Sequence, residues 1–184
     1  KEVKDVISLI DWGPSIHILA NEINLGSKYA PARAISWFFE KVEEGIVLED
    51  DISPSVSFFK FCDLMLEKYR SNLRIGSISG HTGISDIYHP QSDYYYSIYV
   101  HCWGWAGWRR SWNYFSFSDQ WIRCSMDDAL LNKISANNKS FVSYWRRIRD
   151  QVLDGKINTA WDYYWTFSCW INGLSTIMPK YSLV

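Results

Sequence analysis

The sequence has few of the residues that mark a disulfide-stabilised, zinc-binding or membrane-spanning protein. Its 184 residues include four cysteines, widely spaced and without a CxxC pair, which predicts reduced core thiols, no zinc site and a cytoplasmic location. The net charge of −1 gives no excess of basic residues, so no nucleic-acid partner is expected. No apolar run approaches the length of a transmembrane helix, so no membrane span is expected.

Aromatic residues, by contrast, are abundant. Eleven Trp, twelve Tyr and nine Phe are concentrated in residues 94–121 and 141–170. Flat aromatic faces suit sugar rings and bases, but they also fill protein cores. Because hydrophobic residues make up 47% of a chain long enough for one buried core, bulk disorder is excluded. Composition alone favours the core for most of these rings.

The order of apolar patterns predicts an α/β fold. In the first half, helices are expected over residues 1–10, 30–42 and 54–69, and strands over residues 15–20, 45–48 and 74–79. This alternation is typical of a parallel sheet flanked by helices. The second half is less regular, with helices expected near residues 126–134, 141–153 and 159–171 and a closing strand at 176–178.

Three consecutive carboxylates, Glu49, Asp50 and Asp51, follow the apolar strand expected at residues 45–48. In open α/β sheets, ligands bind beyond the carboxyl ends of the strands. Carboxylate oxygens select hard cations such as Mg²⁺ or Mn²⁺, which keep open positions for phosphate oxygens. The alternative is a solvated loop before the next helix, with Ser53 as its N-cap and Pro54 at its first position.

The segment GIVLEDDI at residues 45–52 resembles the metal-binding motif of GT-A glycosyltransferases in its Glu-Asp-Asp form. Further segments resemble bacterial nucleotide-diphospho-sugar transferase-like proteins: NLG at 24–26, WFF at 37–39, WGWAGWR at 103–109 and WDYYW at 161–165. The likeness implies one GT-A-like (Rossmann-like) domain over residues 1–184, with a mixed, mainly parallel sheet flanked by helices. Residues 1–79 would hold the nucleotide sugar and metal, and residues 80–184 would form the acceptor side.

The resemblance implies a metal-dependent transfer of a sugar from a nucleotide-diphosphate sugar to a glycan or other hydroxyl acceptor, with inversion favoured. Asp51 would bind Mn²⁺ or Mg²⁺, while Glu49 and Asp50 would face the ribose and the donor sugar. Asp162 matches a tryptophan-flanked Asp that is the catalytic base of the N-acetylglucosaminyltransferases that build branched glycans. Its position near a predicted helix start favours the ionised form, and a helix cap is the alternative.

Other residues carry weaker expectations. Asn24 and Arg33 are expected near the nucleotide. The remaining candidates would form a wall of the sugar and acceptor site, with an arginine near phosphate: Trp103, Trp105, Trp108, Arg109, Trp161 and Trp165. For the first three tryptophans, the alternative is a core strand followed by surface arginines. His81 and His89 are expected to line the cleft from a loop.

Two parts of the family pattern are missing from this chain. It starts after the strands that would hold the nucleotide base, and it ends before a histidine that often lies near the metal. Either a fragment of a longer protein or a trimmed, N-terminally incomplete fold is therefore expected, and its exposed edge strands favour a homodimer. Two alternatives to an enzyme stay open: a catalytically inactive carbohydrate-binding or interaction domain derived from this fold, and a structural scaffold.

Overall fold

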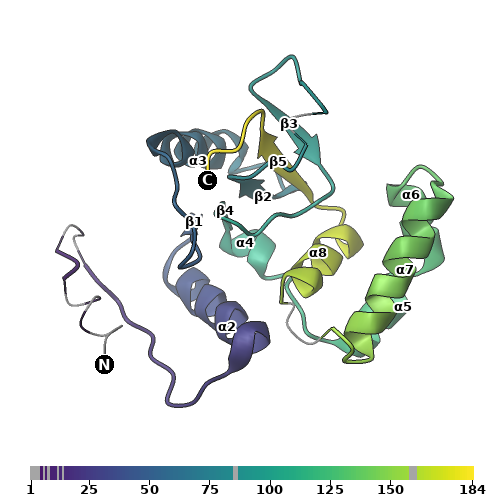
Figure 1. The fold of residues 1–184 in the computed structure, drawn as a ribbon, viewed down its shortest axis with the longest axis horizontal. Coiled ribbons are helices and arrows are strands. Elements are labelled where there is room, and N and C mark those ends of the chain that lie inside the picture. The colour runs from purple at the N-terminus through teal and green to yellow at the C-terminus, as the bar shows by residue number, and fades with distance from the viewer. Residues whose placement is uncertain are drawn as a thin grey trace.

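A computed structural model describes residues 5, 7, 9–11, 13, 15–84, 87–157 and 161–184. Within this part of the chain, five strands form one open sheet with helices on both faces (Figure 1). Across the sheet the strands lie in the order β1 (Glu44–Val47), β4 (Trp105–Trp108), β2 (Ile75–Ser79), β5 (Ser175–Pro179) and β3 (Tyr94–Ser97). The predicted α/β class is confirmed.

The sheet is mixed, as expected, but its ladders are mostly antiparallel. Strands β1, β2 and β5 run in one direction, yet β4 lies between β1 and β2 and pairs antiparallel with both. Of the described pairings, that of β2 with β5 is parallel, and β3 pairs antiparallel with β5. The expectation of a mainly parallel sheet is therefore wrong, because three of the four described pairings are antiparallel. Strands β1 and β3 form the two sheet edges, and a homodimer through such an edge stays a prediction.

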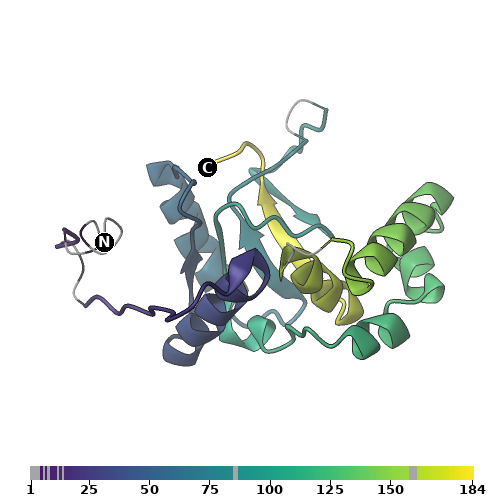
Figure 2. The ribbon, with the colours of Figure 1, turned by 60° about the horizontal axis from the view of Figure 1, so that its bottom comes forward.

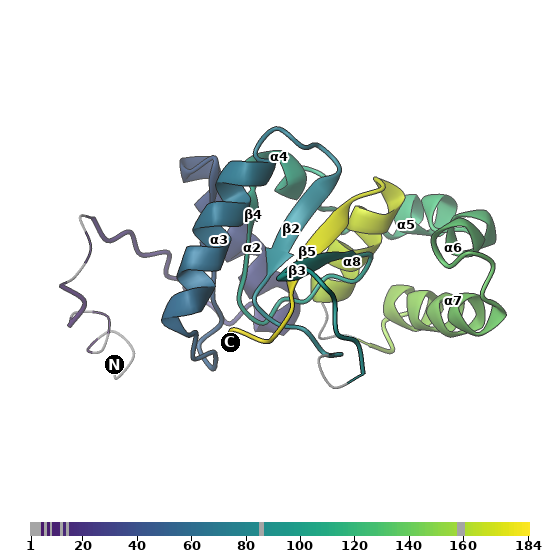
Figure 3. The same ribbon diagram turned by 90° about the horizontal axis from the view of Figure 1, so that it is seen from above.

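Helices cover the sheet on both faces (Figures 2 and 3). On one face, α2 (Gly26–Lys41) and α8 (Trp161–Ile171) form a core cluster with Trp105, and on the other α3 (Val56–Tyr69) packs on Ala106 and Trp108. This division follows from strand geometry, because successive side chains of β4 point to opposite faces. The strand WAGW therefore contributes to both cores.

A further group of helices extends the fold beyond the sheet. Figure 1 shows α6 (Asp128–Ile134) and α7 (Lys139–Leu153) at the right, and α5 (Asp119–Ser125) joins them in a third core cluster. Tyr164, Phe167 and Trp170 of α8 belong to this cluster, whereas Trp161, Trp165 and Cys169 belong to the first. Helix α8 is therefore buried almost all round, which explains its apolar sequence.

Several predicted boundaries differ from the structure. The strand expected at 15–20 is absent, since these residues are largely exposed and irregular, and much of the helix expected at 1–10 lies outside the described residues. The N-cap of α3 is Ser55, whose Oγ accepts from the N–H of Phe58 at 3.3 Å, and not Ser53. Among the helices of the described residues, none combines the length and hydrophobicity that a bilayer crossing requires.

Candidate functional site

The three consecutive carboxylates lie in a turn at the carboxyl end of β1. The carbonyl of Glu49 accepts a hydrogen bond from the N–H of Ile52 at 3.3 Å, which closes the turn. Glu49 is half-buried, whereas Asp50 and Asp51 are exposed. The registers Val47↔Trp105 and Ser79↔Trp105 place the start of β4 and the end of β2 at the same sheet end. The acidic loop therefore stands at the strand ends where ligands of open α/β sheets bind.

Asp162 lies in the first turn of α8, as predicted. Hydrogen bonds from its own backbone N–H and that of Tyr163 lower the pKa of its carboxyl, but burial has the larger effect and raises that pKa overall. The residue nevertheless keeps solvent contact. The helix end stabilises the ionised form of Asp162, as expected, but the effect of burial on the pKa is larger.

The fold brings Asp162 to the acidic loop. The pKa of Glu49 is raised first by burial and then by the nearby negative charges of Asp51, Asp162 and Asp50. Cys102 connects the two elements: its thiol is buried, and its pKa is raised by burial and by the charges of Asp162 and Glu49. Cys102 also shares a core cluster with Trp161 and Trp165 of α8. The acidic loop and the start of α8, which are far apart in the chain, thus lie near the same core cluster.

The carboxylates of this loop could bind a cation whose other coordination positions are filled by phosphate oxygens of a substrate. Among the described residues, no group of three or more His, Cys, Asp or Glu side chains is arranged to hold a metal ion. Exposed carboxylates such as those of Asp50 and Asp51 are nevertheless suitable donors for Mg²⁺ or Mn²⁺, which are often bound by one or two carboxylates plus phosphate oxygens. The donor set therefore suits a cation that arrives with a phosphorylated substrate better than a permanently caged one.

Most of the predicted aromatic wall lies in the core. Trp105, Trp108, Trp161 and Trp165 are buried, with exposed fractions of 1%, 2%, 5% and 0%. A sugar ring cannot stack on a side chain without accessible surface, so the wall is wrong for these four residues. Trp103 differs, because 52% of its surface is exposed. The core-strand alternative is correct for Trp105 and Trp108.

Arg109 lies at the wrong end of β4 for a phosphate contact near Asp51. It follows Trp108, which pairs with Glu44 at the start of β1. Its guanidinium donates to the carbonyl of Phe39 and to Glu43 Oε1 at 2.5 Å. Arg109 therefore stabilises the C-terminal end of α2, and its predicted phosphate role is wrong.

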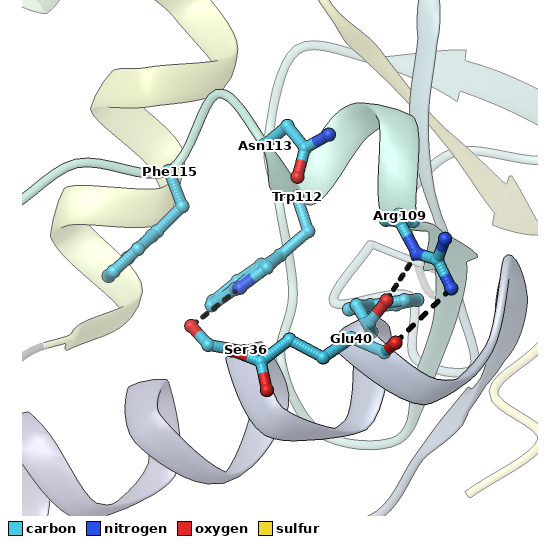
Figure 4. Close-up of a pocket in the computed structure, with 7 residues that line it drawn as sticks. Ser36, Glu40, Arg109, Trp112, Asn113 and Phe115 are labelled. Atoms are coloured by element: carbon cyan, nitrogen blue, oxygen red, sulfur yellow. Dashed lines mark hydrogen bonds between the residues drawn. The ribbon is translucent and has the colours of Figure 1, made fainter.

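A cavity of about 270 Å³ lies beside Arg109, between α2 and α4 (Arg109–Trp112) (Figure 4). Its polar groups largely bond to one another: Trp112 Nε1 donates to Ser36 Oγ at 3.0 Å, and Arg109 donates to backbone carbonyls of α2. The cavity therefore offers few free donors for a phosphate and lies away from the acidic loop.

Asn24 and Arg33 are engaged locally. Asn24 Oδ1 accepts from the N–H of Gly26 at 2.8 Å and so shapes the start of α2, and Arg33 Nη1 donates to Asn21 Oδ1 at 2.6 Å. Neither contact involves the acidic loop, so a role at the nucleotide stays a prediction for both.

The sequence did not predict that Cys102 and His101 lie near the candidate site. Both precede β4, and their relevance depends on β4 pairing with β1, which the local sequence does not encode. The available signal is the strand-like WAGW segment, since its start must lie beside the end of a neighbouring antiparallel strand.

Comparison of the chain with protein-family models and with curated proteins finds no match. The geometry of the site therefore carries the functional argument.

Proposed function

We propose that the chain forms the catalytic core of a metal-dependent glycosyltransferase that uses a nucleotide-diphosphate sugar. One observation carries the proposal: Val47, at the end of β1, packs against the core cluster that contains Trp161, the neighbour of Asp162, and the charge of Asp162 helps to raise the pKa of Glu49. The GT-A resemblance assigns donor binding to the first segment and the catalytic base to the second. Their convergence supports one site that serves both tasks.

In the proposed reaction, the Asp162 carboxylate accepts the proton of the acceptor hydroxyl as that oxygen attacks the sugar. The bond from the sugar to the diphosphate breaks, and the diphosphate leaves with the electron pair. A bound Mn²⁺ or Mg²⁺ would neutralise charge on the leaving diphosphate. The raised pKa of Asp162 suits its role, because a stronger base accepts the proton more readily.

Calorimetric titration with UDP and GDP, with and without Mn²⁺, tests the donor half of the proposal. We expect nucleotide binding that requires Mn²⁺ and that weakens by about tenfold to 100-fold in Asp51→Asn. Asp63→Asn, a change at an exposed carboxyl of α3, is the matched control. Binding that is unchanged by chelator and by Asp51→Asn would contradict the proposal.

The base is tested separately. We expect Asp162→Asn to retain Mn²⁺-dependent nucleotide binding and to lose about 100-fold or more in the rate of sugar transfer or donor hydrolysis. Equal loss of binding in both variants would assign Asp162 to donor binding instead of proton transfer.

A carbohydrate-binding domain without catalysis is the second candidate. The exposed ring of Trp103 favours it, since such a ring can bind a sugar without any metal. Saccharide binding in the presence of chelator, combined with no nucleotide binding, would support this candidate over the enzyme.

A further inference from the structure

Two adjacent cavities lie along α2. The cavity of about 270 Å³ beside Arg109 (Figure 4) is continued by a second cavity of about 470 Å³, and Ser36 and Phe115 line both. Toward the start of α2, the second cavity is lined by Tyr29 and Arg33. Together the two cavities form a groove between α2 and the segment that follows α4, which we call the α2 groove. Its lining includes Arg33, Ser36, Glu40, Trp112, Asn113 and Phe115.

The side of the groove that comes from α4 and the following segment is aromatic. The rings of Trp112 and Phe115 are stacked with centroids 4.4 Å apart, and Phe117 lies edge-on to Phe115 at 4.8 Å. Trp112 is buried, whereas Phe115 and Phe117 are half-buried and keep accessible surface. A hydrocarbon chain that covers these rings removes apolar surface from water, which favours binding.

Hydrogen-bond acceptors lie at the end of the groove near Glu40. The side chains of Glu40 and Asn113 are exposed, and neither has a hydrogen-bond partner within the described part of the chain. Ser36 Oγ accepts from Trp112 Nε1 at 3.0 Å and keeps one lone pair. In Figure 4, Ser36 and Glu40 extend from α2, while Asn113 comes from the end of α4. The three N–H donors of a primary ammonium group match these three acceptors.

Arg109 also lines this end, but its positive charge is compensated. Its guanidinium donates to Glu43 Oε1 at 2.5 Å and to the backbone carbonyls of Phe39 and Glu40. This end of the groove also lies beside the last turns of α2, where helix carbonyls carry partial negative charge. The Glu40 carboxylate therefore keeps a negative charge that favours a cationic group of a ligand.

The other end of the groove carries the positive charge of Arg33. Its Nη1 donates to the neutral amide oxygen of Asn21 at 2.6 Å, and among the described residues no carboxylate pairs with it. A guanidinium has five N–H groups, so further donors remain. Arg33 and Glu40 are about two turns apart on α2, on the same side of the helix and about 10 Å apart along its axis. The groove therefore has charges of opposite sign at its two ends.

We propose that the α2 groove binds a linear zwitterion that has a primary ammonium group at one end, a carboxylate at the other and an apolar spacer between them. The ammonium group donates to Glu40, Asn113 and Ser36, the carboxylate accepts from Arg33, and the spacer covers Phe115. Charge-assisted hydrogen bonds at both ends fix the direction in which such a ligand lies. The inference goes beyond the proposed transferase, since the groove lies away from the acidic loop and needs no metal.

The test is calorimetric titration of the 184-residue chain in the presence of EDTA with ε-aminocaproate, which is a six-carbon ω-amino acid, and with hexylamine and hexanoate. We expect ε-aminocaproate to bind about tenfold more tightly, or better, than either analogue, because each analogue lacks one charged hydrogen-bonding group. Binding should also shift the NMR signal of the Trp112 indole N–H, which lies in the groove and donates to Ser36.

Two variants assign the ends of the ligand. Glu40→Gln should weaken ε-aminocaproate binding to the level of hexanoate, and Arg33→Gln should weaken it to the level of hexylamine, by about tenfold in each case. Both residues are exposed, so both variants should retain the fold. The matched controls are Asp63→Asn on α3 and Arg147→Gln on α7, which change exposed charges outside the groove.

Three results would overturn the inference. They are the absence of ε-aminocaproate binding, binding no tighter than that of hexylamine or hexanoate, and binding that neither Glu40→Gln nor Arg33→Gln weakens. Because this assay contains no metal ion or nucleotide, its outcome is separate from that of the UDP and GDP titration. The zwitterion site can therefore fail while the proposed transferase stands, or stand while the transferase fails.

Discussion

At the scale of single residues, Gly104 lies near Leu48 and Ile52, the residues that flank the acidic loop. Its φ of +66° lies in the left-handed region, which side chains with a Cβ disfavour. A Cβ there would lie 2.8 Å from Val184 Cγ1, closer than such atoms normally approach. Its N-terminal neighbour is Trp103 and its C-terminal neighbour is the start of β4, so this position sets the direction of both.

We expect Gly104→Ala to lower the free energy of unfolding by about 2–3 kcal/mol, from left-handed strain and steric overlap together. Gly173→Ala is the matched control, since Gly173 has a φ of +65° but no atom within 4 Å of a Cβ. The control should lose about 1–2 kcal/mol from strain alone. If urea denaturation shows that both variants lose the same free energy of unfolding, the steric overlap at Gly104 has no cost.

His81 and His101 predict a loss of stability in mild acid. Burial lowers the pKa of both, and the charge of His81 lowers the pKa of His101 further. The unfolded chain therefore binds more protons than the folded chain between the folded pKa values and the ordinary value of about 6.5. The free energy of unfolding should fall as the pH decreases below about 6.5.

Comparison of wild type with His101→Gln isolates this effect from carboxyl titration. The variant should show a shallower decrease of unfolding free energy between about pH 6.5 and 5, measured by urea denaturation at each pH. His89→Gln, in an exposed loop, is the control. A slope unchanged by His101→Gln would refute the contribution of this imidazole.

The tryptophans show what single residues do and do not reveal in sequence. Trp103 and Trp105 are two positions apart and have the same chemistry, yet one is half exposed and the other is buried. The difference arises because Trp105 lies in a strand covered by α2 and α8, while Trp103 lies in the loop before it. That cover is formed by distant segments, so local sequence does not separate the two residues.

At the scale of secondary-structure elements, two consecutive arginines form hydrogen bonds with the C-terminal ends of helices on opposite faces of the sheet. Arg109 donates to carbonyls at the C-terminal end of α2. Arg110 donates to the carbonyls of Tyr69, Arg70 and Ile75 at 3.2, 3.2 and 3.0 Å, at the end of α3 and the start of β2. Cations favour helix C-termini because the last carbonyls are unpaired and carry partial negative charge.

We expect Arg110→Ala to lower the free energy of unfolding by about 2–3 kcal/mol, because three carbonyls lose a charged donor. Arg110→Lys should retain only a minor part of this stabilisation, since one ammonium group cannot reproduce the several planar donors of the guanidinium. Arg146→Ala, which breaks a solvent-exposed ion pair with Asp128, should change the free energy of unfolding much less. An Arg110→Ala variant as stable as Arg146→Ala would contradict this capping role.

The elements differ in how far local sequence predicts them. Helices α3, α6, α7 and α8 and strands β1, β2 and β5 lie close to their expected positions, because periodic apolar residues and capping signals mark them. Strand β3 was not expected, and β4 was expected only as the alternative for its tryptophans. Neither segment alternates polar and apolar residues, and β4 is inserted between β1 and β2 by long-range pairing.

At the scale of the whole molecule, the fold brings two separate sequence motifs near one another. The loop after β1 was predicted from its place directly after an apolar strand, and Asp162 from a family resemblance. Their proximity was not predictable from spacing, because it depends on β1 and α8 packing into the same core cluster. The interactions among Glu49, Asp162 and Cys102 are thus a property of the tertiary structure.

The most direct test of this account is paramagnetic broadening of backbone amide NMR signals by Mn²⁺ in the presence of UDP or GDP. The account predicts that Mn²⁺ broadens the signals of Glu49, Asp51, Cys102 and Asp162 together, while signals of α6 and α7 stay sharp. The broadening should disappear in Asp51→Asn. Broadening confined to the acidic loop without Asp162, or spread evenly over the chain, would contradict a shared metal and catalytic site.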